Sequence, residues 1–229
     1  DFACPDKGES LASGLERWRK KAVGKTFCDY GFHMTIDDWN EGISREIGEM
    51  AAEGIPSFKM YMTYPAMMIG EGDMYRALLR LKEAGGIAGV HCENDGVIRA
   101  LTEDARARGA LGPGSHPRTR PAPLEAEAVA HLLRLAQLAD APVIIVHLSA
   151  RESLEEVRAA RRRGQTVYVE TCPHYLLLED SVYDSPDFME AAKYVCAPPI
   201  RRREDQEALW EALRSGEIHT VATDHCPFT

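Results

Sequence analysis

Short apolar runs alternate with longer amphipathic segments along the chain, and this alternation limits the folds that the sequence can adopt. A strand reaches a parallel neighbour only through a long crossover, so strands that alternate with helices indicate βα units. Strands are expected at 26–33, 57–62, 87–91, 142–147, 166–171 and 219–223, and helices at 39–53, 73–84, 123–138, 153–163 and 205–214. The sequence therefore predicts an α/β fold.

Two α/β architectures are compatible with this order of elements. A (β/α)₈ barrel whose first strand or strands are missing fits the number of βα units, with residues 1–229 as its central part. A doubly wound open sheet is the alternative. No GxGxxG or Walker-type phosphate loop follows any expected strand, so the usual nucleotide-binding reason for an open sheet is absent. We therefore expect the partial barrel.

Charge and cysteine spacing restrict the partners and the compartment. The 27 basic and 36 acidic side chains give a formal net charge of -9, and an acidic surface repels nucleic acid. No apolar run approaches the roughly 20 residues that span a bilayer, so no membrane association is expected. The six cysteines are scattered and form no CxxC pair, which favours reduced thiols in a cytoplasmic protein.

Both ends of the sequence look like interruptions of a longer chain. There is no initiator methionine, and Asp1 starts within a strand-like run. The last residues stop directly after another strand-like run, whereas natural termini are usually polar and frayed. We expect a longer parent protein.

Four ionisable side chains lie at or near the carboxyl ends of expected strands. Lys59 interrupts an apolar run, and His91, His147 and Asp224 each close one. The carboxyl ends of the strands form the catalytic face of a barrel. Singly, the histidines could be structural, Lys59 could extend its ammonium to solvent, and Asp224 could cap a helix. Together, the four side chains predict a metal cluster.

A lysine ammonium is a poor metal ligand, but the neutral amine has another chemistry. It can capture carbon dioxide, and the resulting carbamate has two oxygens that can bridge two cations. Burial lowers the pKa of a lysine and so favours the neutral amine. Lys59 is therefore a candidate bridging ligand.

Seven segments, in order along the chain, resemble those of dihydropyrimidinases and hydantoinases in the amidohydrolase superfamily. The order makes the resemblance more specific than any single segment would. Two positions differ from the usual pattern, because Cys92 replaces an alanine and Ala197 replaces a frequent serine. The segments are 57–64 (SFKMYMTY), 90–94 (VHCEN), 120–128 (RPAPLEAEA), 145–149 (IVHLS), 170–176 (ETCPHYL), 193–201 (KYVCAPPIR) and 222–228 (ATDHCPF).

The resemblance implies a metal-dependent ring-opening hydrolase, with a dihydropyrimidine or a 5-substituted hydantoin giving an N-carbamoyl amino acid. Lys59 would be N6-carboxylated and bridge two divalent ions, usually Zn²⁺. His91 and His147 would bind one ion. Asp224 would bind the other ion and act as general base and acid.

The same resemblance implies how the small-molecule substrate is bound. Tyr64 would donate its hydroxyl to the oxyanion, and the backbone of Ala197 would hydrogen-bond the ring amide. The apolar loop at 65–70 favours apolar 5-substituents. The parent protein is expected to be a homotetramer.

Some features of the family have no counterpart in this sequence. The family's first barrel strand carries a His-x-His pair, and no HxH occurs here. The terminal β-sandwich and a C-terminal substrate-binding asparagine are also absent, so the chain alone is expected to be inactive.

Alternatives are an allantoinase or dihydroorotase-like amidase, or a non-catalytic family member. Retention of all four ligands in this span favours catalysis.

The arginine runs at 161–163 and 201–203 are expected to be solvated faces.

Overall fold

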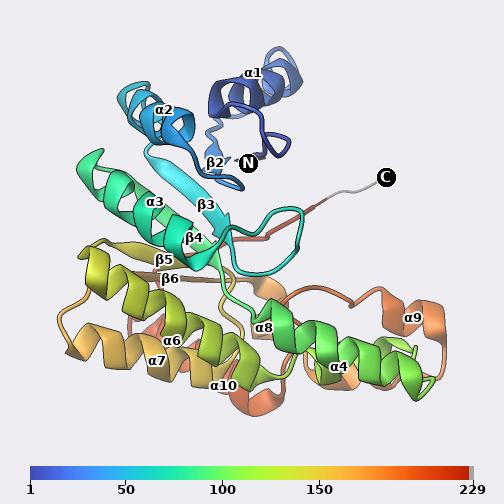
Figure 1. Ribbon diagram of the computed structural model, residues 1–229. Coiled ribbons are helices and arrows are strands. Elements are labelled where there is room, and N and C mark those ends of the chain that lie inside the picture. Colours follow the sequence, from blue (N-terminus) through green and yellow to red (C-terminus); the bar gives the residue numbers. More distant parts are fainter. Residues whose placement is uncertain (227–229) are drawn as a thin grey trace. The chain divides into compact units, whose positions relative to one another are not determined.

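The structure, a computed structural model, describes residues 1–226, and the chain divides into two compact units. Unit 1 consists of residues 1–91 and 134–144, and unit 2 consists of residues 92–133 and those from 145 onward. Helix α6 (Ala122–Ala139) and strand β5 (Val143–Ile145) have residues in both units. Figure 1 labels the elements along the chain.

Parallel strands form the sheet of unit 1, and each strand pairs with the one that precedes it. They are β1 (Phe2–Ala3), β2 (His33–Thr35), β3 (Ser57–Tyr61) and β4 (Ile87–His91). The connecting helices are α1 (Leu11–Ala22), α2 (Glu41–Ala52) and α3 (Glu71–Glu83). Helices α2 and α3 lie side by side in Figure 1. The α/β alternation predicted for this part of the chain is confirmed.

Strand β3 is buried on both of its faces. Phe58 and Met60 are 1% and 0% exposed, and they share the core of unit 1 with Ile47 of α2 and Leu78 of α3. Burial of each large apolar side chain contributes about 1.5–3 kcal/mol. Successive side chains of a strand point to opposite faces, so Lys59 projects to the face opposite Phe58 and Met60. That face is buried as well, because Lys59 is only 2% exposed.

Local sequence signals fix where the helices of unit 1 begin and end. The side chain of Asn40 accepts a hydrogen bond from the Ile43 backbone N–H at 3.0 Å and caps α2. Such a cap contributes about 1 kcal/mol. Gly54 follows α2 with φ +90°, a conformation that glycine adopts without a Cβ clash. The helix expected at 73–84 starts earlier, at Glu71, and Gly70 is its N-cap residue.

Unit 2 combines one parallel strand pair with several helices. The strands are β6 (Val167–Thr171) and β7 (Thr220–Val221). The longer helices are α4 (Asp95–Ala107), α7 (Arg151–Arg162) and α10 (Arg203–Arg214). The short ones are η1 (Pro113–Ser115), α5 (His116–Thr119), α8 (Pro173–Leu177), η2 (Asp180–Asp184) and α9 (Phe188–Ala192). Helix α10 contacts both α7 and α8.

The strand expected at 26–33 is wrong in its position. The strand β2 covers His33–Thr35, and Phe27 and Tyr30 are exposed side chains in the preceding loop. Aromatic residues in 26–32 suggested a strand, but buried residues begin only at Met34 and continue through Ile36. None of the helices within residues 1–226 has the length and apolar character that crossing a membrane requires.

Candidate active site

Lys59 occupies the middle of β3, and two aromatic rings lie near its ammonium group. In the sheet it lies opposite Thr35 of β2 and Gly89 of β4. Its Nζ atom is 5.2 Å from the ring centroid of Phe2 and 5.0 Å from that of Tyr61. Aromatic faces attract a cation, but removing an ammonium from water is costly.

His91 ends β4 and contacts two tyrosine rings. It lies opposite Tyr61 in the parallel register, and the two ring centroids are 6.0 Å apart. The ring of Tyr64 meets His91 edge-on at 5.2 Å. Tyr64 has φ +67°, so the chain turns sharply after β3, and the Met67 and Met68 backbone N–H groups donate to the Tyr64 carbonyl. Tyr64 and His91 are thus neighbours within unit 1, and the Tyr61 ring lies next to both His91 and Lys59.

His147 follows β5 at a sharp change of backbone direction. It has φ +40° and is 4% exposed. The residues after it are held by hydrogen bonds, because the Leu148 N–H donates to the Glu170 carbonyl at 2.8 Å and the Thr171 hydroxyl donates to the Leu148 carbonyl at 2.8 Å. These hydrogen bonds therefore fix the backbone next to His147, from which its side chain projects.

A buried carboxylate holds the backbone just beyond His147. Glu125 of α6, 2% exposed, accepts hydrogen bonds from the Ser149 backbone N–H at 2.9 Å and from the Ser149 hydroxyl. The Arg201 guanidinium donates to Glu125 at 2.9 Å, to Ser149 at 3.0 Å and to the Arg120 carbonyl at 2.6 Å. Arg120 in turn pairs with Glu93 at 3.0 Å. These contacts form a fully paired polar network inside unit 2.

The network corrects one expectation from the sequence. Arg201 was expected on a solvated face, yet it is only 7% exposed, whereas Arg202 and Arg203 are exposed. A run of three arginines suggests solvent, but the partner of Arg201 is Glu125, which is distant in sequence. The only sequence signal was that both residues fall within the resembling segments.

Ala197 and Asp224 also belong to unit 2. Ala197 is half-buried and precedes a cis peptide bond to Pro198. Asp224 is exposed, has φ +48° and follows β7. Burial lowers the pKa of His174, and the nearby Asp224 carboxylate opposes that shift. The last residues of the segment at 222–228 lie outside the described residues.

The predicted ligands thus fall in two groups, one in each unit. Lys59 and His91 belong to unit 1, and His147 and Asp224 belong to unit 2. Within residues 1–226, no three His, Cys, Asp or Glu side chains are close enough together to hold a metal ion.

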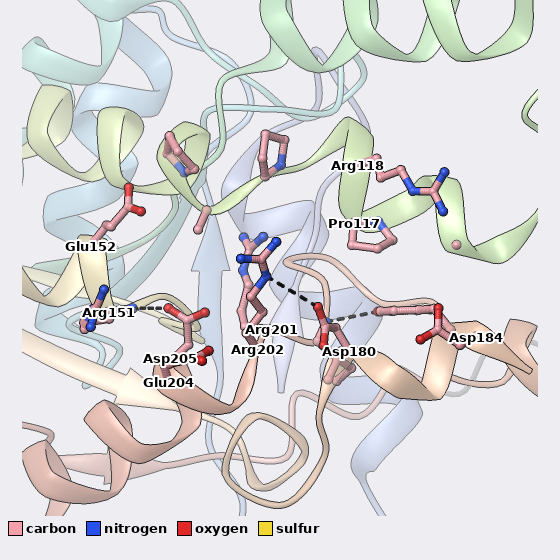
Figure 2. Close-up of a pocket in the computed structure, with 16 residues that line it drawn as sticks. Pro117, Arg118, Arg151, Glu152, Asp180, Asp184, Arg201, Arg202, Glu204 and Asp205 are labelled. Atoms are coloured by element: carbon pink, nitrogen blue, oxygen red, sulfur yellow. Dashed lines mark hydrogen bonds and ion pairs between the residues drawn. The ribbon is translucent and has the colours of Figure 1, made fainter. Parts of the chain in front are cut away.

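Unit 2 also contains a charged cavity of about 580 Å³ that was not predicted. Figure 2 shows acidic and basic side chains facing each other across it. The Arg151 backbone N–H donates to Asp205 at 2.8 Å, and Arg202 lies 3.9 Å from Asp180. Burial raises the pKa of Asp205. None of the predicted site residues lines this cavity.

Comparison of the sequence with known proteins finds close relatives of one kind. None of the protein-family models matches the chain. It is 45% identical over 229 residues to a D-hydantoinase of Streptomyces coelicolor and 40% identical over 230 residues to a D-hydantoinase of Geobacillus stearothermophilus. Each match covers 100% of this chain and 49% of the relative. The chain therefore spans about half the length of these curated relatives.

Solved structures give the same result for the fold. A dihydropyrimidinase from Brevibacillus agri has a TM-score of 0.97 at 42% identity, covering 100% of this chain and 50% of that one. An L-hydantoinase from Arthrobacter aurescens has a TM-score of 0.80 at 28% identity, covering 94% and 47%. The predicted fold class, a partial (β/α)₈ barrel with parallel strands, is confirmed.

Proposed function

This chain is a homologue of the hydantoinases and dihydropyrimidinases along its whole length, and from that premise we propose that its parent protein opens cyclic amides by hydrolysis. The substrate would be a dihydropyrimidine or a 5-substituted hydantoin, and the product an N-carbamoyl amino acid. The observation that carries the proposal is the arrangement of Lys59 within β3, Tyr64 just after β3 and His91 at the end of the adjacent parallel strand β4. A dihydroorotase shares only the fold, at 16% identity and a TM-score of 0.64.

The proposal includes two divalent metal ions, which we take to be zinc. Buried imidazoles and a carboxylate are ligands that zinc accepts, so His91, His147 and Asp224 fit the ion chemically. The Lys59 amine would form a bond to the carbon of carbon dioxide and release one proton, giving a carbamate with two donor oxygens. When bound, such ions lower the pKa of a water molecule and polarise a carbonyl group.

The remaining roles belong to side chains and backbone of this chain. Asp224 would accept the proton of the attacking water and pass it to the leaving ring nitrogen. Tyr64 would donate its hydroxyl to the carbonyl oxygen as negative charge develops there. The backbone of Ala197 would hydrogen-bond the ring amide and orient the carbonyl. No assigned role requires the side chain of Ala197.

Finer features of the parent protein follow from the same reading. We propose a cytoplasmic homotetramer that binds neither nucleic acid nor membrane. The acidic net charge supports the absence of nucleic-acid binding, and the free cysteines support a reducing compartment. The residues at 65–70 are half-buried or exposed after Tyr64, which suits a loop that contacts an apolar 5-substituent. A relative from Escherichia coli that is 43% identical over 223 residues is a D-phenylhydantoinase.

Asp224→Asn and Tyr64→Phe test the assigned roles in the complete protein, with ring opening of 5-phenylhydantoin as the measurement. We expect kcat to fall about 10²–10⁴-fold for Asp224→Asn, because the general base is lost. For Tyr64→Phe we expect about 10²–10³-fold, because an oxyanion donor is lost. Asp187→Asn is the matched control; it changes the same chemical group at the N-cap of α9, where asparagine also caps. Full activity in Asp224→Asn would contradict the mechanism.

A further inference from the structure

Residues 196–200, here called the strap, are half-buried at Cys196 and Ala197 and buried beyond them. Pro198, Pro199 and Ile200 are buried, whereas Ala197 is half-buried. The strap connects α9 to α10 without regular structure of its own. Side chains from other segments must therefore determine its conformation.

Three side chains from three separate helical elements bind the backbone of the strap. His116 of α5 donates from Nε2 to the Cys196 carbonyl at 2.6 Å. Tyr175 of α8 donates its hydroxyl to the Pro198 carbonyl at 2.6 Å. Tyr183 of η2 accepts from the Ile200 N–H at 3.0 Å and donates to the Tyr194 carbonyl at 3.1 Å. The strap is thus fixed at both ends and in its middle.

Ala197 differs from its neighbours in the hydrogen bonding of its backbone groups. The carbonyl groups of Cys196 and Pro198 and the N–H of Ile200 all have partners. Among the described residues, neither the backbone N–H nor the carbonyl of Ala197 makes a hydrogen bond. A backbone donor and acceptor held open in this way is suited to a planar amide, which offers the complementary pair.

His116, Tyr175 and Tyr183 keep the protons that they donate to the strap. Burial raises the pKa of both Tyr175 and Tyr183, so their hydroxyls stay protonated. Burial lowers the pKa of His116, so its imidazole is neutral near pH 7, and the Cys196 carbonyl selects the tautomer with a proton on Nε2. These hydrogen bonds therefore persist throughout the neutral pH range.

We infer that His116, Tyr175 and Tyr183 are positioning residues, which hold the strap so that the Ala197 backbone can bind the ring amide of the substrate. This inference rests on the proposed function. The three side chains act through the backbone, and none of them is assigned contact with the substrate. Their loss should weaken substrate binding more than it slows the chemical step.

His116→Leu and Tyr183→Phe in the complete protein test this inference. We expect KM for 5-phenylhydantoin to rise about tenfold while kcat changes less than about twofold, because one hydrogen bond to substrate corresponds to roughly that factor. His116→Gln keeps an N–H donor and should restore most of the loss. Hydrogen exchange at the Ile200 amide should become faster in Tyr183→Phe, because its acceptor is gone.

His219→Gln is the matched control, because the His219 ring also bonds a backbone group, the Val169 N–H at 3.1 Å, but away from the strap. It should leave KM unchanged. If His116→Leu fails to fold, Tyr183→Phe and His116→Gln still decide the result. Unchanged KM in both Leu and Phe variants would overturn the inference while leaving the proposed function intact. Absence of any cyclic-amide hydrolysis in the unsubstituted protein would instead overturn the proposed function.

Discussion

His116 links the acidity of the solution to the stability of unit 2. Burial lowers the pKa of its imidazole, Arg120 and Arg201 add to the decrease, and the Cys196 carbonyl and Glu93 oppose it. The unfolded chain has the ordinary histidine pKa of about 6.5. Between the folded pKa and about 6.5, the unfolded state binds more protons, so stability decreases as the pH falls through this window.

We therefore expect the free energy of unfolding to decrease below about pH 6.5 in the unsubstituted protein and to decrease less in His116→Gln. Urea unfolding at several pH values between 5 and 8 measures both. Since other groups titrate in the same range, the difference between the two proteins is the relevant quantity. Parallel pH profiles for the two proteins would show that His116 has no such role.

The Glu125–Arg201 pair connects the turn after β5 with the start of α10. Both side chains are almost fully buried, and the carboxylate also binds Ser149. Removal of one partner from a buried ion pair leaves the other charge without compensation. The pair therefore holds the segment beyond His147 and the segment beyond the strap in one arrangement.

Glu125→Gln should lower the free energy of unfolding by about 3 kcal/mol, because Arg201 would remain buried beside a neutral amide. The measurement is urea denaturation with a constant m-value. Glu207→Gln is the control, since Glu207 pairs with Arg203 on an exposed turn of α10 at 3.1 Å. Exposed pairs of this kind contribute little, so no measurable loss is expected there. Similar losses in both variants would contradict the assignment.

At the level of elements, sequence periodicity predicts which strands are buried, but not which charged side chains pair with a remote partner. The apolar runs around Lys59 and before His147 predicted strands β3 and β5, because burial of a strand leaves a continuous apolar pattern. The strand at 26–33 failed because Phe27 is apolar but exposed. The prediction that Arg201 lies on a solvated face was wrong for the opposite reason, since a charge can be buried when a remote partner compensates it.

The same distinction applies to the candidate site. Lys59, His91 and His147 stood out because each is ionisable and adjoins an apolar strand, and all three are buried. The side chains that bind the strap gave no such signal. Tyr175 and Tyr183 have ordinary side chains in ordinary contexts, and only the fold shows that their hydroxyls reach the backbone beside Ala197.

At the scale of the whole molecule, the chain spans about half of its curated relatives, and it contains no His-x-His pair. The resemblance assigns such a pair to the second metal ion, for which this chain would supply only Lys59 and Asp224. We therefore expect residues 1–229 expressed alone to lack the ring-opening activity that we propose for the complete protein. The assay should use a host without its own cyclic amidase. Hydrolysis by the isolated chain would contradict the two-metal proposal.

Ala197 has a practical consequence for anyone who searches this protein by mutation. Alanine scanning replaces side chains and leaves the main chain in place, so it passes over a residue that is already alanine and contributes only its peptide groups. Libraries of single substitutions would score position 197 as tolerant and His116, Tyr175 and Tyr183 as sensitive. Such a map would identify the side chains that hold the strap and would miss the proposed contact at the Ala197 backbone. Replacing the Ala197 amide with an ester by chemical synthesis would probe it directly.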